Sequence, residues 1–203
     1  MAEVAQANKA KPTLAGWVAR DALITLSLIA VLWALHIWHA DAGGALSTVV
    51  TPTIGFIAAY ILCYIYHEWG HLVGASWSGG HMPLAPYAGP IIGTFAIAKH
   101  SRTQFLWLSW GGVTAYVTIM VIAVGVYVTG TLGSAGAGLA VGGLAFVSQS
   151  LAVDLPQILA VRRGADIATT SAAGASAQII LRRTWQTWIP LAALLAVWNL
   201  VFH

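Results

Sequence analysis

The chain has 203 residues, a net charge of +3 at neutral pH, 59% apolar residues and only 7% charged ones. Together with a mean hydropathy of +0.79, this composition is typical of a polytopic membrane protein and leaves no room for a separate soluble domain. The single cysteine, Cys63, excludes an internal disulfide and is expected to be a packing residue.

Apolar runs predict an all-α polytopic membrane protein that forms one transmembrane domain over residues 1–203. At roughly 20 residues a span we expect about five transmembrane helices. A short loop from Asp41 to Val50 should separate the first two. Gly138 and Gly142 open the fourth span at a four-residue spacing that lets helices approach closely. The expected spans are residues 22–40, 52–77, 104–128, 136–161 and 184–202.

Residues 84–98, between the second and third spans, are moderately apolar but interrupted by glycine and proline. Such a stretch cannot hold a long helix. We expect a re-entrant segment or a β-hairpin here. Irregular backbone at membrane depth is tolerated only where protein or a water-filled cavity satisfies it.

Positive charge indicates how the spans are oriented. With five spans and a cytoplasmic N-terminus, every lysine and arginine lies on the cytoplasmic side, as the positive-inside rule requires. We therefore expect an integral protein of the bacterial inner membrane. The nine residues are Lys9, Lys11, Arg20, Lys99, Arg102, Arg162, Arg163, Arg182 and Arg183.

The second span carries the sequence His67-Glu68-Trp69-Gly70-His71, a His-Glu-x-x-His motif. On a helix, histidines four residues apart share one face and can hold one zinc ion, Zn²⁺. Glu68, one step round the helix, can take a proton from a water on the open position of the metal. Ionisable residues are costly inside a membrane, so we interpret His67 and His71 as metal ligands and Glu68 as a catalytic base.

Catalytic zinc usually has three protein ligands, so His67 and His71 need a partner. The candidates are Asp154, Glu68, His81 and His100. Asp154 is preferred because it is the only acidic residue in the last three expected spans, where an unpaired carboxylate would be expensive to bury. At 1.5 Å per residue, the motif and Asp154 both lie roughly 10 to 15 Å from the cytoplasmic ends of their spans. They should therefore be able to meet.

With these motifs the chain, from about residue 50 to 165, resembles the site-2 protease family of intramembrane zinc metalloproteases. In that family an HExxH helix is followed by a hairpin or re-entrant element, a further span, and a helix whose aspartate completes the zinc site. His67, Glu68 and His71 match the first motif in full. Asp154 matches the aspartate, but Leu155 replaces the glycine that follows it in the family.

The resemblance implies a hydrolase that cleaves transmembrane segments of other membrane proteins near the cytoplasmic face. Its partners would be a membrane-protein substrate and the lipid bilayer, and the segment from Leu84 to Ala98 could clamp an extended substrate strand. Leu155 motivates an alternative, a non-catalytic subunit derived from a protease within a larger membrane complex.

Two other readings follow from the remaining residues. His36 and His39 lie near Trp33 and Trp38, which leaves open a pigment or haem association, although such groups are also typical of an aromatic belt at the membrane edge. A metal transporter is disfavoured because no second polar helix marks a path across the bilayer. The chain has no nucleic-acid motif.

Overall fold

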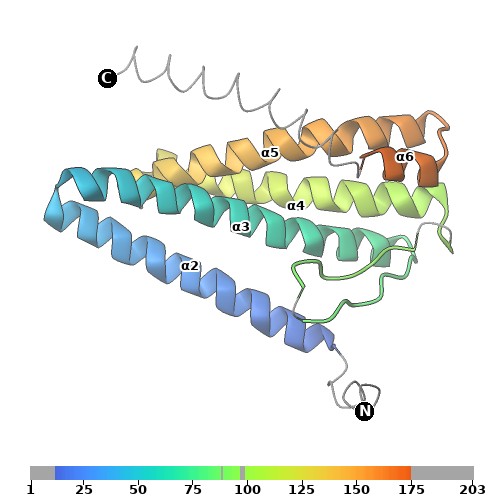
Figure 1. Cartoon of the computed structure of the whole chain (residues 1–203), viewed down its shortest axis with the longest axis horizontal. Helices are drawn as coiled ribbons and strands as arrows, with labels where there is room; N and C mark the ends of the chain where they lie inside the picture. Colours follow the sequence, from blue (N-terminus) through green and yellow to red (C-terminus); the bar gives the residue numbers. More distant parts are fainter. Residues whose placement is uncertain (1–11, 88, 97–98, 175–203) are drawn as a thin grey trace, which may run out of the picture.

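The computed structural model describes residues 12–87, 89–96 and 99–174. Four long helices, each apolar and long enough to cross a membrane, make up most of this part of an integral membrane protein. They are α2 (Leu14–Ala42), α3 (Ala45–Trp77), α4 (Arg102–Val128) and α5 (Gly133–Arg162), and the short helix α6 (Ile167–Gly174) follows (Figure 1). The expected fifth span at 184–202 lies outside the described residues.

Each of the first four expected spans lies inside a longer helix. The predicted loop from Asp41 to Val50 is wrong, because only Gly43 and Gly44 separate α2 from α3. Gly43 ends α2 with a φ of 53°, a left-handed conformation that glycine adopts without strain. The hydroxyls of Ser47 and Thr48 then bond back to Gly44 O, which lets polar residues form the first turn of α3.

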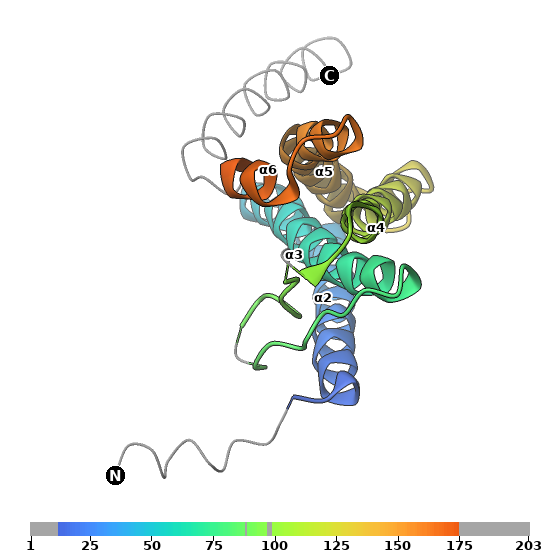
Figure 2. The same cartoon turned by 90° about the vertical axis from the view of Figure 1, so that its right-hand side faces the viewer.

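Helix α3 lies at the centre of the bundle and packs against α2, α4 and α5 (Figure 2). Its crossing with α5 is very close. A Cβ on Gly138 would collide with Pro52 O, and one on Gly142 would lie 2.5 Å from Phe56 O. The close approach predicted from these two glycines is confirmed.

The segment between α3 and α4 lies beside the N-terminal half of α2 (Figure 1). Leu84 and Gly93 form an isolated antiparallel bridge, and Ala85 N–H donates to Ile92 O at 2.9 Å. The described residues contain this single bridge rather than a strand pair. The position of the segment relative to a bilayer stays a prediction.

Positive charge among the described residues is concentrated at one end of the bundle. The start of α2, the end of α3, the start of α4 and the end of α5 all lie there (Figure 1). Arg102 at the start of α4 donates to Gly164 O, just after α5, at 3.1 Å. The lysines and arginines among the described residues therefore lie toward one side: Arg20, Lys99, Arg102, Arg162 and Arg163.

Candidate metal centre

The two motif histidines converge on one point. Nε2 of His67 and Nε2 of His71 lie 2.9 Å apart, on successive turns of α3. The two atoms lie at hydrogen-bond distance, and two nitrogens bound to one tetrahedral zinc ion lie about 3.3 Å apart for Zn–N bonds of about 2.05 Å, so the rings must separate by about 0.4 Å to share an ion. Nδ1 of His71 lies 2.9 Å from Leu108 O. Since a carbonyl can only accept, Nδ1 carries the proton and Nε2 presents a lone pair.

Helix α4 fits closely against the motif because glycines line their crossing. A Cβ on Gly70 would collide with Gly111 O, and one on Gly74 would collide with Trp107 O. At Gly112 a Cβ would lie 2.5 Å from Cε1 of His71 and 2.9 Å from Nδ1 of His67. Gly70 belongs to the motif itself. The turn that carries the histidines therefore also carries a glycine that lets α4 approach closely.

Asp154 lies on α5 and bonds to a tyrosine rather than to the histidines. Tyr116 OH donates to Oδ2 of Asp154 at 3.5 Å, and the Tyr116 ring centroid lies 5.4 Å from that of His67. Within residues 12–87, 89–96 and 99–174, no three His, Cys, Asp or Glu side chains lie close enough together to hold one metal ion. The structure thus brings His67 and His71 together, and the Tyr116 side chain contacts both His67 and the third predicted ligand, Asp154.

Glu68 faces the segment between α3 and α4. Its Oε2 accepts a hydrogen bond of 3.3 Å from the backbone N–H of Ile92, whose side chain is fully buried. The carboxylate is therefore held by protein backbone at the edge of the motif turn.

The N-terminal end of α2 holds both the motif helix and this segment, which the sequence did not reveal. Asp21 is buried, accepts from Nε1 of Trp69 at 2.8 Å and forms an ion pair of 2.7 Å with Arg20. Arg20 also donates to Tyr87 O and Gly89 O at 3.2 and 2.9 Å. The available signal was an acid beside an arginine at the edge of an apolar run.

The loop histidines lie apart from the motif pair. His100 accepts from the backbone N–H of His81 at 3.0 Å and stacks on Phe95 with ring centroids 4.0 Å apart. This pairing orders the chain after α3, and it does not add a ligand to His67 and His71.

His36 and His39 lie near the C-terminal end of α2, at the opposite end of the bundle from the motif (Figure 1). Nδ1 of His39 lies 3.2 Å from Oγ of Ser47, and the His36 ring meets Trp33 edge-on at 5.9 Å. Both rings therefore have neighbours at the junction of α2 and α3, and the predicted pigment or haem association stays untested.

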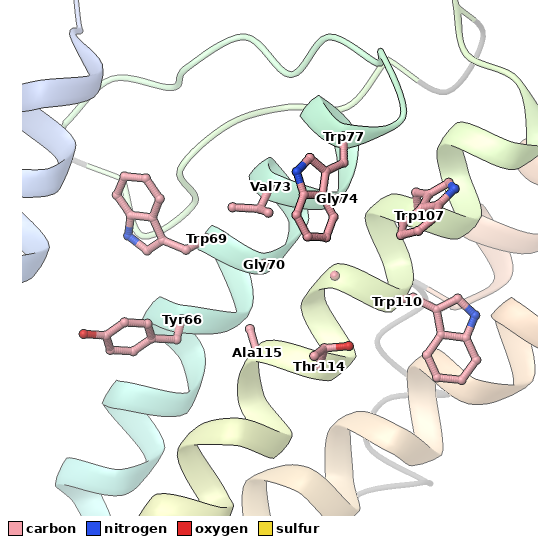
Figure 3. Close-up of a pocket in the computed structure, with 11 residues that line it drawn as sticks. Tyr66, Trp69, Gly70, Val73, Gly74, Trp77, Trp107, Trp110, Thr114 and Ala115 are labelled. Atoms are coloured by element: carbon pink, nitrogen blue, oxygen red, sulfur yellow. The ribbon is translucent and has the colours of Figure 1, made fainter.

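An apolar groove of about 380 Å³ flanks the motif on the α3–α4 surface (Figure 3). Trp69 and Gly70 of the motif line one part of it, and Trp77 and Trp107 meet edge-on at 6.3 Å near its end. The groove reaches the motif turn at Trp69 and Gly70, and neither His67 nor His71 lines it.

The chain matches no protein-family model, no curated protein and no solved structure. The resemblance to site-2 proteases accordingly depends on His67, Glu68, His71 and Asp154 and on the order of the helices that carry them.

Proposed function

We propose that the protein is an intramembrane zinc metalloendopeptidase of the site-2 protease type, acting on transmembrane segments of other membrane proteins. The observation that carries this is the 2.9 Å approach of the His67 and His71 nitrogens in a partly buried helical turn next to Glu68. Such a cluster of ionisable groups at membrane depth is costly and is retained for function.

His67 and His71 would hold the zinc, and Asp154 would complete the site by leaving Tyr116. That change requires rotation of a side chain on α5, since the aspartate already lies next to the tyrosine that contacts His67. Zinc bound there supplies Lewis-acid activation of water and of the substrate carbonyl. The nitrogens and the carboxylate are ligand types that zinc prefers.

Glu68 acts as the general base and then as the general acid. It takes the proton of the attacking water and returns it to the leaving nitrogen, so that one carboxyl group serves both steps. To do so it must exchange its hydrogen bond with Ile92 N–H for one with water.

We further propose that the segment from Leu84 to Ala98 re-enters the membrane and binds the extended substrate. Its isolated antiparallel bridge at Leu84 and Gly93 supports this, because it shows extended backbone near Glu68 against which an additional strand could pair. The protein would lie in a bacterial inner membrane. Its N-terminus would lie in the cytoplasm, and the gathering of lysines and arginines at one end of the bundle supports that orientation.

The test compares three variants of the purified protein in lipid nanodiscs. Glu68→Gln should retain zinc and lose cleavage of a panel of tagged single-span membrane proteins, and His67→Ala should lose both. His36→Ala removes a histidine of α2 at the far end of the bundle, and it should keep both. Cleavage that persists in Glu68→Gln would remove the mechanism, and a zinc content equal in His67→Ala and wild type would remove the site.

A second candidate is a non-catalytic subunit of a larger membrane complex. The hydrogen bond between Asp154 and Tyr116 favours it, since a carboxylate satisfied by a tyrosine needs no metal. Zinc content distinguishes the two: a subunit without chemistry purifies without stoichiometric zinc, and it co-purifies with its partner from native membranes.

A further inference from the structure

Two series of contacts join the start of α2 to the turn that carries Glu68. Nε1 of Trp17 donates to Ala85 O at 3.1 Å, and Ala85 N–H donates to Ile92 O at 2.9 Å. Ile92 N–H in turn donates to Glu68. In the other direction, Arg20 pairs with Asp21, and Asp21 accepts from Trp69, the residue after Glu68.

Arg20 makes contacts in both series. Its guanidinium carbon lies 3.7 Å from the centroid of the Trp17 ring, and it donates to two backbone carbonyls of the segment as well as to Asp21. The Arg20 side chain is 26% exposed and that of Asp21 is 7% exposed, so most of the pair is shielded from solvent. A planar guanidinium with several donors can hold the ring, the carboxylate and the carbonyls at once.

Trp17 is fully buried in a hydrophobic cluster that also contains Ile92, and Arg20 adds hydrogen bonds to the backbone of the segment. Trp17 donates to the carbonyl of Ala85, and Arg20 donates to those of Tyr87 and Gly89. Asp21 fixes the motif helix through Trp69. These two sets of contacts therefore set the distance between the segment and α3. Ile92 N–H donates to Glu68 across that distance.

We propose that Arg20 and Asp21 are positioning residues for Glu68: they hold the backbone N–H of Ile92 on the Glu68 carboxylate and so fix where that carboxylate points. The structural part stands on the contacts alone, and the consequence for catalysis rests on the proposed protease activity. Removing the contacts made by Arg20, Asp21, Trp17 and Trp69 frees the Glu68 carboxylate from its hydrogen bond with Ile92 N–H and misplaces the carboxylate.

The chain offers a sharp spectroscopic test because it contains only two glutamates, Glu3 and Glu68. Selective ¹³C labelling of glutamate side chains gives two carboxyl signals, and the one missing in Glu68→Gln belongs to Glu68. Arg20→Ala should shift this signal, whereas Arg102→Ala should not. Arg102→Ala is a matched control, since it removes the same charge and a hydrogen bond to a different loop, at Gly164.

Hydrogen exchange supplies a second readout on the same samples. In Arg20→Ala the amides of Ala85 and Thr94, which donate to Ile92 O and Pro83 O, should exchange about tenfold faster or more, since hydrogen bonds to charged groups are the stronger ones. Asp21→Asn keeps the shape of the side chain and should give a smaller change in the same direction. An unshifted Glu68 signal with unchanged exchange in both variants would overturn the proposal.

Cleavage then separates this proposal from the proposed function. If the wild type cleaves, Arg20→Ala should lower kcat by about tenfold with little change in KM, because a misplaced general base slows the chemical step. An unchanged kcat with a shifted Glu68 signal would overturn the catalytic role. If the wild type binds no zinc and cleaves nothing, the protease function fails, and the carbon signal still decides whether Arg20 positions Glu68.

Discussion

The hydroxyl of Tyr116 on α4 donates a hydrogen bond of 3.5 Å to Oδ2 of Asp154 on α5. The same ring lies against His67 on α3, with ring centroids 5.4 Å apart. Tyr116 is fully buried, so this single side chain links the predicted carboxylate ligand to the histidine pair.

Replacing Tyr116 by phenylalanine tests that link. In Tyr116→Phe the aspartate has no hydrogen bond to give up before it reaches the metal, so zinc affinity should rise by up to about tenfold, the equivalent of one hydrogen bond of about 0.5 to 1.5 kcal/mol. Asp154→Asn should weaken zinc binding by about tenfold or more. Competition with a fluorescent zinc chelator measures both. Tyr127→Phe changes an exposed tyrosine of the same helix and should have no effect. Unchanged affinity in Asp154→Asn would show that Asp154 is not a ligand.

Gly112 offers a separate test of the histidine pair. Gly112→Ala places a Cβ within 2.5 Å of the His71 ring and 2.9 Å of the His67 ring, so the rings must move. We expect at least about a tenfold loss of zinc affinity, since loss of the orientation of a ligand typically costs about 10- to 100-fold. Gly125→Ala lies on the same helix with nothing within 4 Å of its Cβ, and it should bind zinc as the wild type does. Equal affinities in the two variants would contradict a site at His67 and His71.

The sequence predicted the parts of this arrangement that depend on local spacing. The four-residue separation of His67 and His71 predicted two rings on one helical face, and their nitrogens lie 2.9 Å apart. For Asp154 the sequence predicted the distance from the end of its span, and it did not predict which neighbouring side chain the carboxylate meets. Because α5 is apolar on all sides, its sequence does not indicate which face turns toward α3, and the rotation that directs Asp154 to Tyr116 was not predictable.

Asp21 was missed for a different reason. It directly precedes the first expected span, which begins at residue 22, and nothing in the local sequence assigns it a role. Its burial depends on Trp69, a residue 48 positions away, and on the chain segment that Arg20 holds. Contacts between residues this distant in sequence arise from tertiary packing, which periodicity within one helix does not encode.

A larger residue at the crossing of α3 and α5 should lower the stability of the protein without removing the zinc site at His67 and His71. In Gly138→Ala the new Cβ collides with Pro52 O, on the turn of α3 far from the motif. Overpacking of this kind typically costs about 1 to 3 kcal/mol. Unfolding monitored by circular dichroism in a denaturing detergent should show this loss, with Gly125→Ala as the control. The folded fraction should keep the zinc content of the wild type, and a loss of zinc there would mean that the crossing also shapes the site.

The direction of insertion can be measured with single cysteines, because the one native cysteine is fully buried and can be removed as Cys63→Ala. In that background, Asp41→Cys reports the end of α2 and Thr103→Cys the start of α4, both exposed positions. Positive residues gather near Thr103, so the positive-inside rule places this end in the cytoplasm. A membrane-impermeant maleimide should therefore label Asp41→Cys in intact cells and Thr103→Cys only after lysis. The reverse pattern would place the histidine pair nearer the outer face and would exclude cleavage near the cytoplasm.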